Sequence, residues 1–211
     1  MKKDTPRGSA VMNVLCSDSV ADVGKEYLEI GVDTLLESGA LKDIPIVNTV
    51  VGIFSVAGSV RDHLLTSKLL RFLIQFTEVP QHERIIMVEK LNDDDKFAGR
   101  AGAAVIEILD RMESEKKPEL AAKCFAAYAR DEISFEELRR ILLALERTPS
   151  FDIEKLEQFS QATIAEVIKM DEALLLSFVN AGLGQNNGGF DGGAILPTQL
   201  CKKFVSICLF S

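Results

Sequence analysis

Residue types that carry chemistry are scarce in this sequence. It has no tryptophan, two histidines and four cysteines, and no two of the cysteines form a Cys-x-x-Cys pair. A chain of 211 residues with so few cysteines is not typical of a disulfide framework, and two histidines offer little for a metal site. We therefore expect no metal and no cofactor. The cysteines are expected to be reduced thiols, mostly in the core of a cytosolic protein.

Basic charge is also in deficit. Lysine and arginine number 24 against 32 aspartates and glutamates, which gives a net charge of −8. Neither residues 1–150 (−5) nor residues 151–211 (−3) are basic. Because nucleic-acid binders usually carry a basic face, nucleic acid is a disfavoured partner.

We expect neither a membrane-spanning segment nor a signal peptide in this sequence. Residues 44–60 carry no charge, but they fall short of the roughly 20 residues that a spanning helix needs, and they include Pro45 and Asn48. The apolar stretch before Cys16 is far too short for a secretory signal. We therefore expect a flexible tail over residues 1–9 and a cytoplasmic location.

Catalytic motifs are missing as well. Neither HExxH nor GxSxG occurs. Asp62 is adjacent to His63, but neighbouring side chains on a helix point in different directions, so the pair defines no mechanism. Cys124 stands among small apolar residues typical of a helix core. The sequence therefore predicts no catalytic residue and a protein that is not an enzyme.

Helical patterning is what the sequence does have. Apolar residues recur at helical spacing over 61–76, and Ser134 with Glu137 forms a capping box that opens a helix to about residue 147. Further helices are expected over 81–91, 95–112 and 118–127. Small residues near Gly102 would let another backbone approach closely.

Strand-like alternation is nearly absent before residues 148–150, which are the best linker candidate. The predicted fold is mostly α. It consists of a multi-helix bundle over 10–148 and a small C-terminal module with a short β-hairpin over 151–211.

The segment 44–76 admits two interpretations. It can form a central helix hairpin in the core, or its bulky apolar face and its cations, such as Lys68 and Arg71, can lie on an anionic membrane at the inner face. Residues 44–73, with the pattern IPxxNTxxGxxxxxxSxRDxLxxxKLLxFL, resemble uncharacterised bacterial helical proteins, which implies no activity. The candidate membrane contacts are Val51, Phe54, Leu65, Leu69, Leu70 and Phe72.

The C-terminal quarter carries a more specific pattern. The run TIAEVIKMDEALLLSFVNAGL (163–183) precedes a glycine-rich segment over 182–193 and then AILPTQLCKKF (194–204). These residues resemble a winged helix-turn-helix module. The resemblance implies a support helix over 163–168, a turn at 169–170, a recognition helix over 171–181, a wing over 184–193 and a last helix after Thr198. Cys201 stands where the family has glycine.

The expected recognition helix is unsuited to DNA. Neutralisation of phosphates supplies much of the affinity for DNA, but this helix has no cation and begins with Asp171 and Glu172. We therefore expect the module to contact protein, through Leu175, Leu176 and Phe190 if they are exposed.

The sequence thus predicts a non-enzymatic intracellular interaction or regulatory protein that has a protein partner or associates with itself. One alternative is a membrane-associating effector that acts through residues 44–76. The other is a winged-helix DNA-binding regulator.

Overall fold

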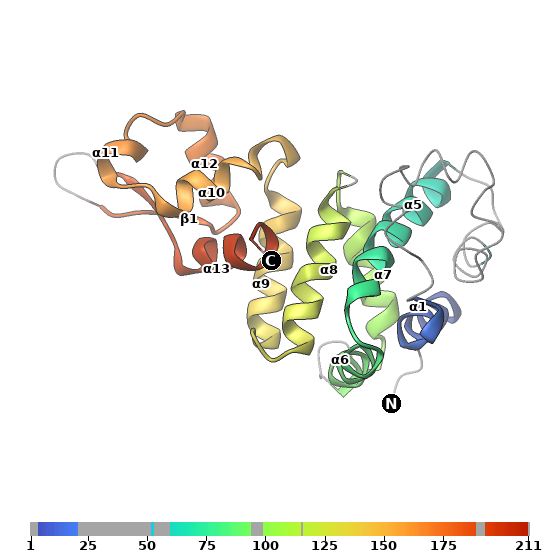
Figure 1. The fold of residues 1–211 in the computed structure, drawn as a ribbon. Helices are drawn as coiled ribbons and strands as arrows, with labels where there is room; N and C mark the ends of the chain where they lie inside the picture. Colours follow the sequence, from blue (N-terminus) through green and yellow to red (C-terminus); the bar gives the residue numbers. More distant parts are fainter. Residues whose placement is uncertain are drawn as a thin grey trace. The chain divides into compact units, whose positions relative to one another are not determined.

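The computed structural model describes residues 4–20, 52, 60–93, 99–114, 116–188 and 193–210. In these residues the chain is mostly helical, with a two-stranded antiparallel hairpin near the C-terminus (Figure 1), which confirms the predicted fold class. The chain divides into two compact units, Met1–Glu132 and Ile133–Ser211. The division precedes the helix capped by Ser134, whereas the sequence pattern favoured a linker at 148–150.

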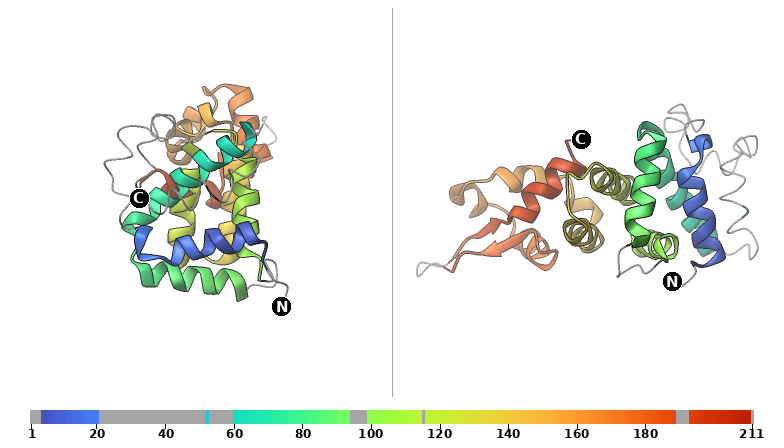
Figure 2. Two further views of the ribbon diagram at one scale, coloured as in Figure 1. Left: turned by 90° about the vertical axis from the view of Figure 1, so that its right-hand side faces the viewer. Right: turned by 90° about the horizontal axis from the view of Figure 1, so that it is seen from below.

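The first unit is built from helices packed around an aromatic core. Helix α1 packs against α6 and α7, α5 packs against α7 and α8, and α1 runs beside α6 in the left view of Figure 2. The ring of Phe72 meets that of Phe125 edge-on, with centroids 5.6 Å apart, and Phe76 is 5.0 Å from Phe72. The described elements are α1 (Pro6–Cys16), η1 (Asp18–Val20), α5 (Val60–Gln75), η3 (Phe76–Glu78), α6 (Gln81–Asp93), α7 (Ala101–Arg111) and α8 (Lys116–Ala129).

The start of the chain differs from the expected flexible tail over 1–9, because α1 begins at Pro6. The side chain of Thr5 accepts a hydrogen bond from the Gly8 N–H at 3.0 Å, and proline suits the first helical position. The carboxylate of Asp4 accepts the N–H groups of Gly102 and Ala103, at 2.9 and 3.1 Å, at the positive end of α7. Contacts distant in sequence therefore order this segment.

Helices α1 and α7 approach each other backbone to backbone. A Cβ added at Gly102 would lie 2.0 Å from the carbonyl oxygen of Gly8, so the predicted close approach is confirmed at this residue. The helix itself begins later than the expected residue 95. Gly99 has a φ of 74°, in the left-handed region, and α7 begins at Ala101, while residues 94–98 lie outside the described ranges.

A buried arginine joins three of these elements. The guanidinium of Arg84, on α6, donates hydrogen bonds to the carbonyl oxygens of Leu15 (2.8 Å), Ser17 (2.7 Å), Phe76 (3.1 Å) and Val79 (2.7 Å). Carbonyls at and after the C-terminal ends of helices lack intrahelical partners. One side chain therefore satisfies the ends of both α1 and η3.

The second unit begins with α9, which opens with the predicted capping box. The hydroxyl of Ser134 accepts the Glu137 N–H at 3.2 Å, and the Glu137 carboxylate accepts the Ser134 N–H at 2.8 Å. The elements of this unit are α9 (Phe135–Arg147), η4 (Ser150–Asp152), α10 (Lys155–Gln161), α11 (Ile164–Val167), α12 (Glu172–Asn180), β1 (Gly184–Asn186), β2 (Ile195–Pro197) and α13 (Gln199–Cys208).

Residues 163–208 form a helix–turn–helix, a hairpin and a final helix in that order. Strand β1 pairs antiparallel with β2, with Gln185 opposite Leu196. Thr198 caps α13, since its hydroxyl accepts the Cys201 N–H at 3.1 Å and donates to the carbonyl of Leu183 at 3.1 Å. Helix α10 packs on α13, and α12 packs on β1. Helix α11 packs on β2, so α11 and α12 are each held against one strand of the hairpin.

Candidate functional site

The residues predicted to contact a partner have different environments. Leu176 is 48% exposed, whereas its neighbour Leu175 is 7% exposed and belongs to the core. Phe190 lies outside the described residues. Of the three predicted contact residues, Leu176 is therefore the one that the structure places at the surface.

The exposed face of α12 is apolar and acidic. Its exposed residues are Glu172, Ala173, Leu176 and Asn180, which recur at helical spacing, while Phe178 is fully buried. The ring of Phe178 packs against that of Phe159 on α10, with centroids 4.9 Å apart. This contact fixes the rotation of α12 and so determines that Leu176 faces outward.

The preceding helix adds two apolar side chains that the sequence reasoning missed. Ile164 and Ile168 are both exposed, Ile168 at 71%, and the Ile168 N–H donates to the Ile164 carbonyl at 3.1 Å. Val167 is the buried residue of this short helix. The apolar pair at i and i+4 was visible in the sequence, but it is equally typical of a core-facing helix.

Acidic side chains accompany these apolar residues. Residues 164–180 contain three carboxylates, Glu166, Asp171 and Glu172, against the single cation Lys169. Hydrogen bonds from the N–H and then from the hydroxyl of Thr163 hold the pKa of Glu166 below its usual value, so this carboxylate is ionised at neutral pH. Five exposed residues lie in this stretch of the sequence, in α11, directly after it and in α12, and we refer to them as the α11–α12 surface: Ile164, Glu166, Ile168, Glu172 and Leu176.

An open groove of about 820 Å³ lies between α9 and α13, within the second unit. Its carboxylates are paired: Glu137 with Lys203 at 2.5 Å, and Glu136 with Arg140 at 2.7 Å. The hydrogen bond from Lys203, followed by that from the Ser134 N–H, lowers the pKa of Glu137 to about 2. The groove is lined by Ser134, Glu136, Glu137, Arg140, Gln199, Leu200, Lys202, Lys203 and Ser206. Because cations and anions are interspersed, it presents no concentrated charge to a ligand.

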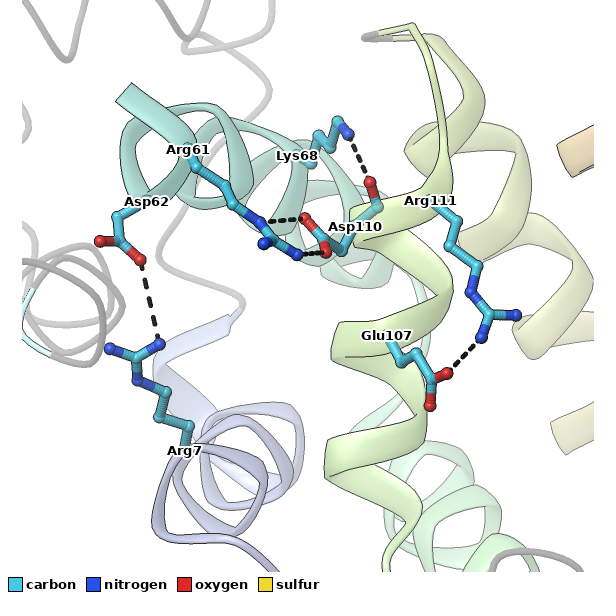
Figure 3. Close-up of polar contacts among 7 residues, drawn as sticks. All are labelled: Arg7, Arg61, Asp62, Lys68, Glu107, Asp110 and Arg111. Atoms are coloured by element: carbon cyan, nitrogen blue, oxygen red, sulfur yellow. Dashed lines mark hydrogen bonds and ion pairs between the residues drawn. The ribbon is translucent and has the colours of Figure 1, made fainter. Parts of the chain in front are cut away.

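A polar cluster in the first unit ties helices together (Figure 3). The guanidinium of Arg61 donates to both carboxylate oxygens of Asp110, and the ammonium of Lys68 donates to the Asp110 carbonyl at 3.1 Å. The hydrogen bond from Arg61 lowers the pKa of Asp110, while burial lowers the pKa of Lys68. The residues of the cluster are Arg7, Arg61, Asp62, Lys68, Glu107, Asp110 and Arg111. Since each drawn cation contacts an acid or a carbonyl, we interpret it as a structural link between α1, α5 and α7.

The candidate membrane-contact residues that the structure describes are buried. Leu65, Leu69, Leu70 and Phe72 are in the core of the first unit, where they contact protein. Val51 and Phe54 lie outside the described residues, as does most of 44–60. Among the residues that are described, no helix combines the length and the apolar character needed to cross a membrane.

The cysteines and the possible metal ligands were also located in the described part of the chain. Those residues include no group of three or more His, Cys, Asp or Glu side chains that could hold a metal ion. The four cysteines are free thiols. Burial raises the pKa of Cys201 to about 12, so this thiol is not a nucleophile at neutral pH.

No protein-family model, curated protein or solved structure matches this chain at a significant level.

Proposed function

We propose that this chain is a non-enzymatic interaction or regulatory protein that contacts a protein partner through the α11–α12 surface. The observation that carries the proposal is the exposed face of α12. It presents Leu176, half exposed, and has no cation along the helix. Such a face suits the apolar contacts of a protein interface better than the phosphates of a nucleic acid.

The distribution of exposed apolar side chains supports a contact made by the second unit. Eight large apolar side chains are exposed in the described part of the chain, and six of them belong to this unit. The six are Leu143, Phe151, Ile164, Ile168, Leu176 and Phe210. Single exposed apolar residues are ordinary, but a concentration of them marks interaction sites. Ile164 lies in α11, Ile168 follows directly as the C-terminal cap of that helix, and Leu176 lies in α12, the next helix along the chain.

A DNA-binding role is less well supported. Protein–DNA affinity depends on lysines and arginines that neutralise phosphates, and helices that enter the major groove use polar side chains to read base edges. The exposed face of α12 carries Glu172 and Leu176 where a DNA-reading helix would carry cations and polar side chains. The phosphates of a duplex on this face would be repelled by the Glu172 carboxylate, and the exposed Leu176 side chain offers them no hydrogen bond.

The test cross-links the full-length protein to the cellular proteins that it contacts and identifies those that it retains. The set retained by the wild type is compared with the set retained by Leu176→Ser. The matched control is Leu143→Ser, because Leu143 is 43% exposed in the same unit but on α9. We expect at least one retained protein to be lost from Leu176→Ser and kept by Leu143→Ser. The proposal would be contradicted if the wild type and both variants retained the same proteins. It would also be contradicted if the wild type bound duplex DNA and Leu176→Ser weakened that binding.

A further inference from the structure

The C-terminal hairpin carries the one Asn-Gly pair of the sequence, Asn187-Gly188, directly after β1. Both residues are exposed. Gly188 has a φ of 63°, and a Cβ built on it would meet no atom within 4 Å, so the space beside this residue is open. Asparagine is a chemically labile residue. Before glycine it is especially so, because the backbone nitrogen that follows can attack the side-chain carbonyl carbon and close a five-membered ring.

Hydrogen bonds hold both of the groups that take part in this reaction. The side-chain carbonyl oxygen of Asn187, Oδ1, accepts the Ala194 N–H at 2.9 Å. The N–H of Gly188, whose nitrogen is the nucleophile, donates to Oδ1 of Asn186 at 3.0 Å. The backbone N–H of Asn187 donates to the Ala194 carbonyl at 3.1 Å. The amide that is attacked and the nitrogen that attacks it are therefore positioned at the same end of the hairpin.

Glycine at position 193 leaves the space that these groups share. A Cβ built on Gly193 would lie 3.0 Å from Oδ1 of Asn187 and 3.0 Å from the nitrogen of Gly188. It would lie closer still to Oδ1 of Asn186. The side-chain amide of Asn187 and the Gly188 nitrogen therefore border one small space that no Cβ fills.

We propose that Asn187 is a modification site, which loses its side-chain amide by spontaneous deamidation with water as the co-reactant. The Gly188 nitrogen attacks Cγ of Asn187 and bonds to it. The Cγ–Nδ2 bond then breaks, and Nδ2 leaves as ammonia with the proton that Gly188 gives up. Water opens the resulting cyclic imide at one of its two carbon–nitrogen bonds. Cleavage of the new bond yields aspartate, and cleavage of the original peptide bond yields isoaspartate.

The Ala194 N–H favours ring closure. Attack on Cγ places negative charge on Oδ1 of Asn187, and an N–H donor about 2.7–3.1 Å from such an oxygen stabilises that charge. The Ala194 N–H is within this range, at 2.9 Å. Asn180 is the natural comparison, because it is also exposed but precedes Ala181. The Ala181 N–H donates to the Ser177 carbonyl at 3.1 Å, so the nitrogen that would attack Asn180 is held by the end of a helix.

The product would change both the charge and the backbone of the hairpin. Residues 184–188 and 193–197 contain no charged side chain, so the new carboxylate would be the first charge in this described part of the hairpin. Isoaspartate also adds one methylene to the main chain between residues 187 and 188, which alters the pairing of Asn187 with Ala194. The inference concerns a different element from the proposed protein contact and does not depend on it.

The test incubates the full-length protein at mildly alkaline pH, because a deprotonated nitrogen is the stronger nucleophile. Peptides are mapped over time by mass spectrometry, and released ammonia is measured. The Asn187 peptide is expected to gain the mass difference between a hydroxyl and an amino group and to separate into aspartate and isoaspartate forms. It should react at least about tenfold faster than the Asn180 peptide, since a glycine and an oxyanion donor assist it.

The matched control variant is Asn187→Gln, which keeps a side-chain amide but requires a six-membered ring and should release little ammonia. The inference is overturned if Asn187 stays intact in the folded protein. Reaction of the same residue in protein unfolded with guanidinium would then show that the hairpin protects it. The inference is also overturned if Asn180 reacts as fast as Asn187, or if Asn187→Gln releases as much ammonia as the wild type.

Discussion

Arg84 shows how a single charged side chain can be accommodated in a core. The residue is 2% exposed, and the hydrogen-bond acceptors of its guanidinium are four backbone carbonyls. Burial lowers the pKa of Arg84, but a guanidinium remains protonated in proteins. The carbonyls at helix C-termini carry partial negative charge, so they stabilise the cation as it satisfies their hydrogen bonds.

Removal of this guanidinium should destabilise the first unit strongly. Arg84→Met keeps much of the side-chain volume but removes the guanidinium donor from four carbonyls, of which, among the described residues, only that of Phe76 also accepts a backbone N–H, from Val79. We therefore expect the free energy of unfolding to fall by about 3 kcal/mol or more. Urea denaturation followed by circular dichroism measures the change. Arg139→Met, at an exposed residue of α9, serves as the control and should change stability by less than about 0.5 kcal/mol. Equal effects of the two substitutions would show that Arg84 contributes through its bulk alone.

Glu137 predicts a specific pH dependence. Its pKa is about 2 in the folded protein against an ordinary value of 4.5, chiefly because Lys203 donates to it. A lowered folded-state pKa means that the contribution to stability is complete above pH 4.5 and is lost as the pH falls towards 2. Glu137→Gln retains an acceptor for the Ser134 N–H but removes the charge.

Wild type should therefore exceed Glu137→Gln in stability at neutral pH, by no more than about 1 kcal/mol, because the Glu137 side chain is 37% exposed and solvent screens the pair. The difference should shrink through acid pH and vanish only below pH 2, where the carboxyl is protonated in both states. Thermal unfolding of both proteins across this range measures it. A difference that stays constant down to pH 2 would mean that the substituted amide disturbs packing and that the charge is not responsible.

At the scale of elements, the crossing of α1 and α7 depends on two glycines. Alanine is the better helix former by about 1 kcal/mol, so helix propensity alone would make Gly102→Ala stabilising. The new Cβ would instead lie 2.0 Å from the Gly8 carbonyl oxygen, and a backbone atom cannot rotate away. We expect a net loss of about 3 kcal/mol as the helices separate.

The comparison variant for this prediction is Gly182→Ala. Its Cβ would meet no atom within 4 Å, but Gly182 has a φ of 77°, so the substitution costs only backbone strain of about 1 kcal/mol. Chemical denaturation ranks the two. The close approach would be unimportant for stability if Gly182→Ala proved the more damaging change.

Elements with local signals were predictable from the sequence, and those fixed by distant contacts were not. The Ser134 capping box and the C-terminal hairpin depend on residues close together in the chain, so their patterns identified them. The order of residues 6–9 depends on Asp4 and Gly8 meeting α7, about a hundred residues away, and no local pattern encodes that. The candidate surface shows the same limit. Three consecutive leucines do not reveal which one faces out, and the buried contact of Phe178 with Phe159 decides it.

At the scale of the molecule, structural and recognition features fall in different units. The first unit holds the Arg84 bonds, the glycine crossing and the cluster of Figure 3, all of which join its own helices. The second unit holds most of the exposed apolar side chains in the described part of the chain. Each unit also has its own aromatic core, around Phe72 and Phe125 in one and around Phe159 and Phe178 in the other.

Because each unit has its own core, we expect damage to one core to leave the other folded. Phe178→Ala removes a fully buried ring and should cost about 3–5 kcal/mol. Hydrogen exchange read by mass spectrometry should then show faster exchange in α10, α12 and α13, with α5 to α8 unchanged, and Gly102→Ala should give the reverse pattern. If Phe178→Ala accelerated exchange equally throughout, the chain would unfold as one cooperative body. The α11–α12 surface could then change partner affinity only through the stability of the whole protein. The expected local pattern would instead let the second unit bind and release a partner while the first stays folded.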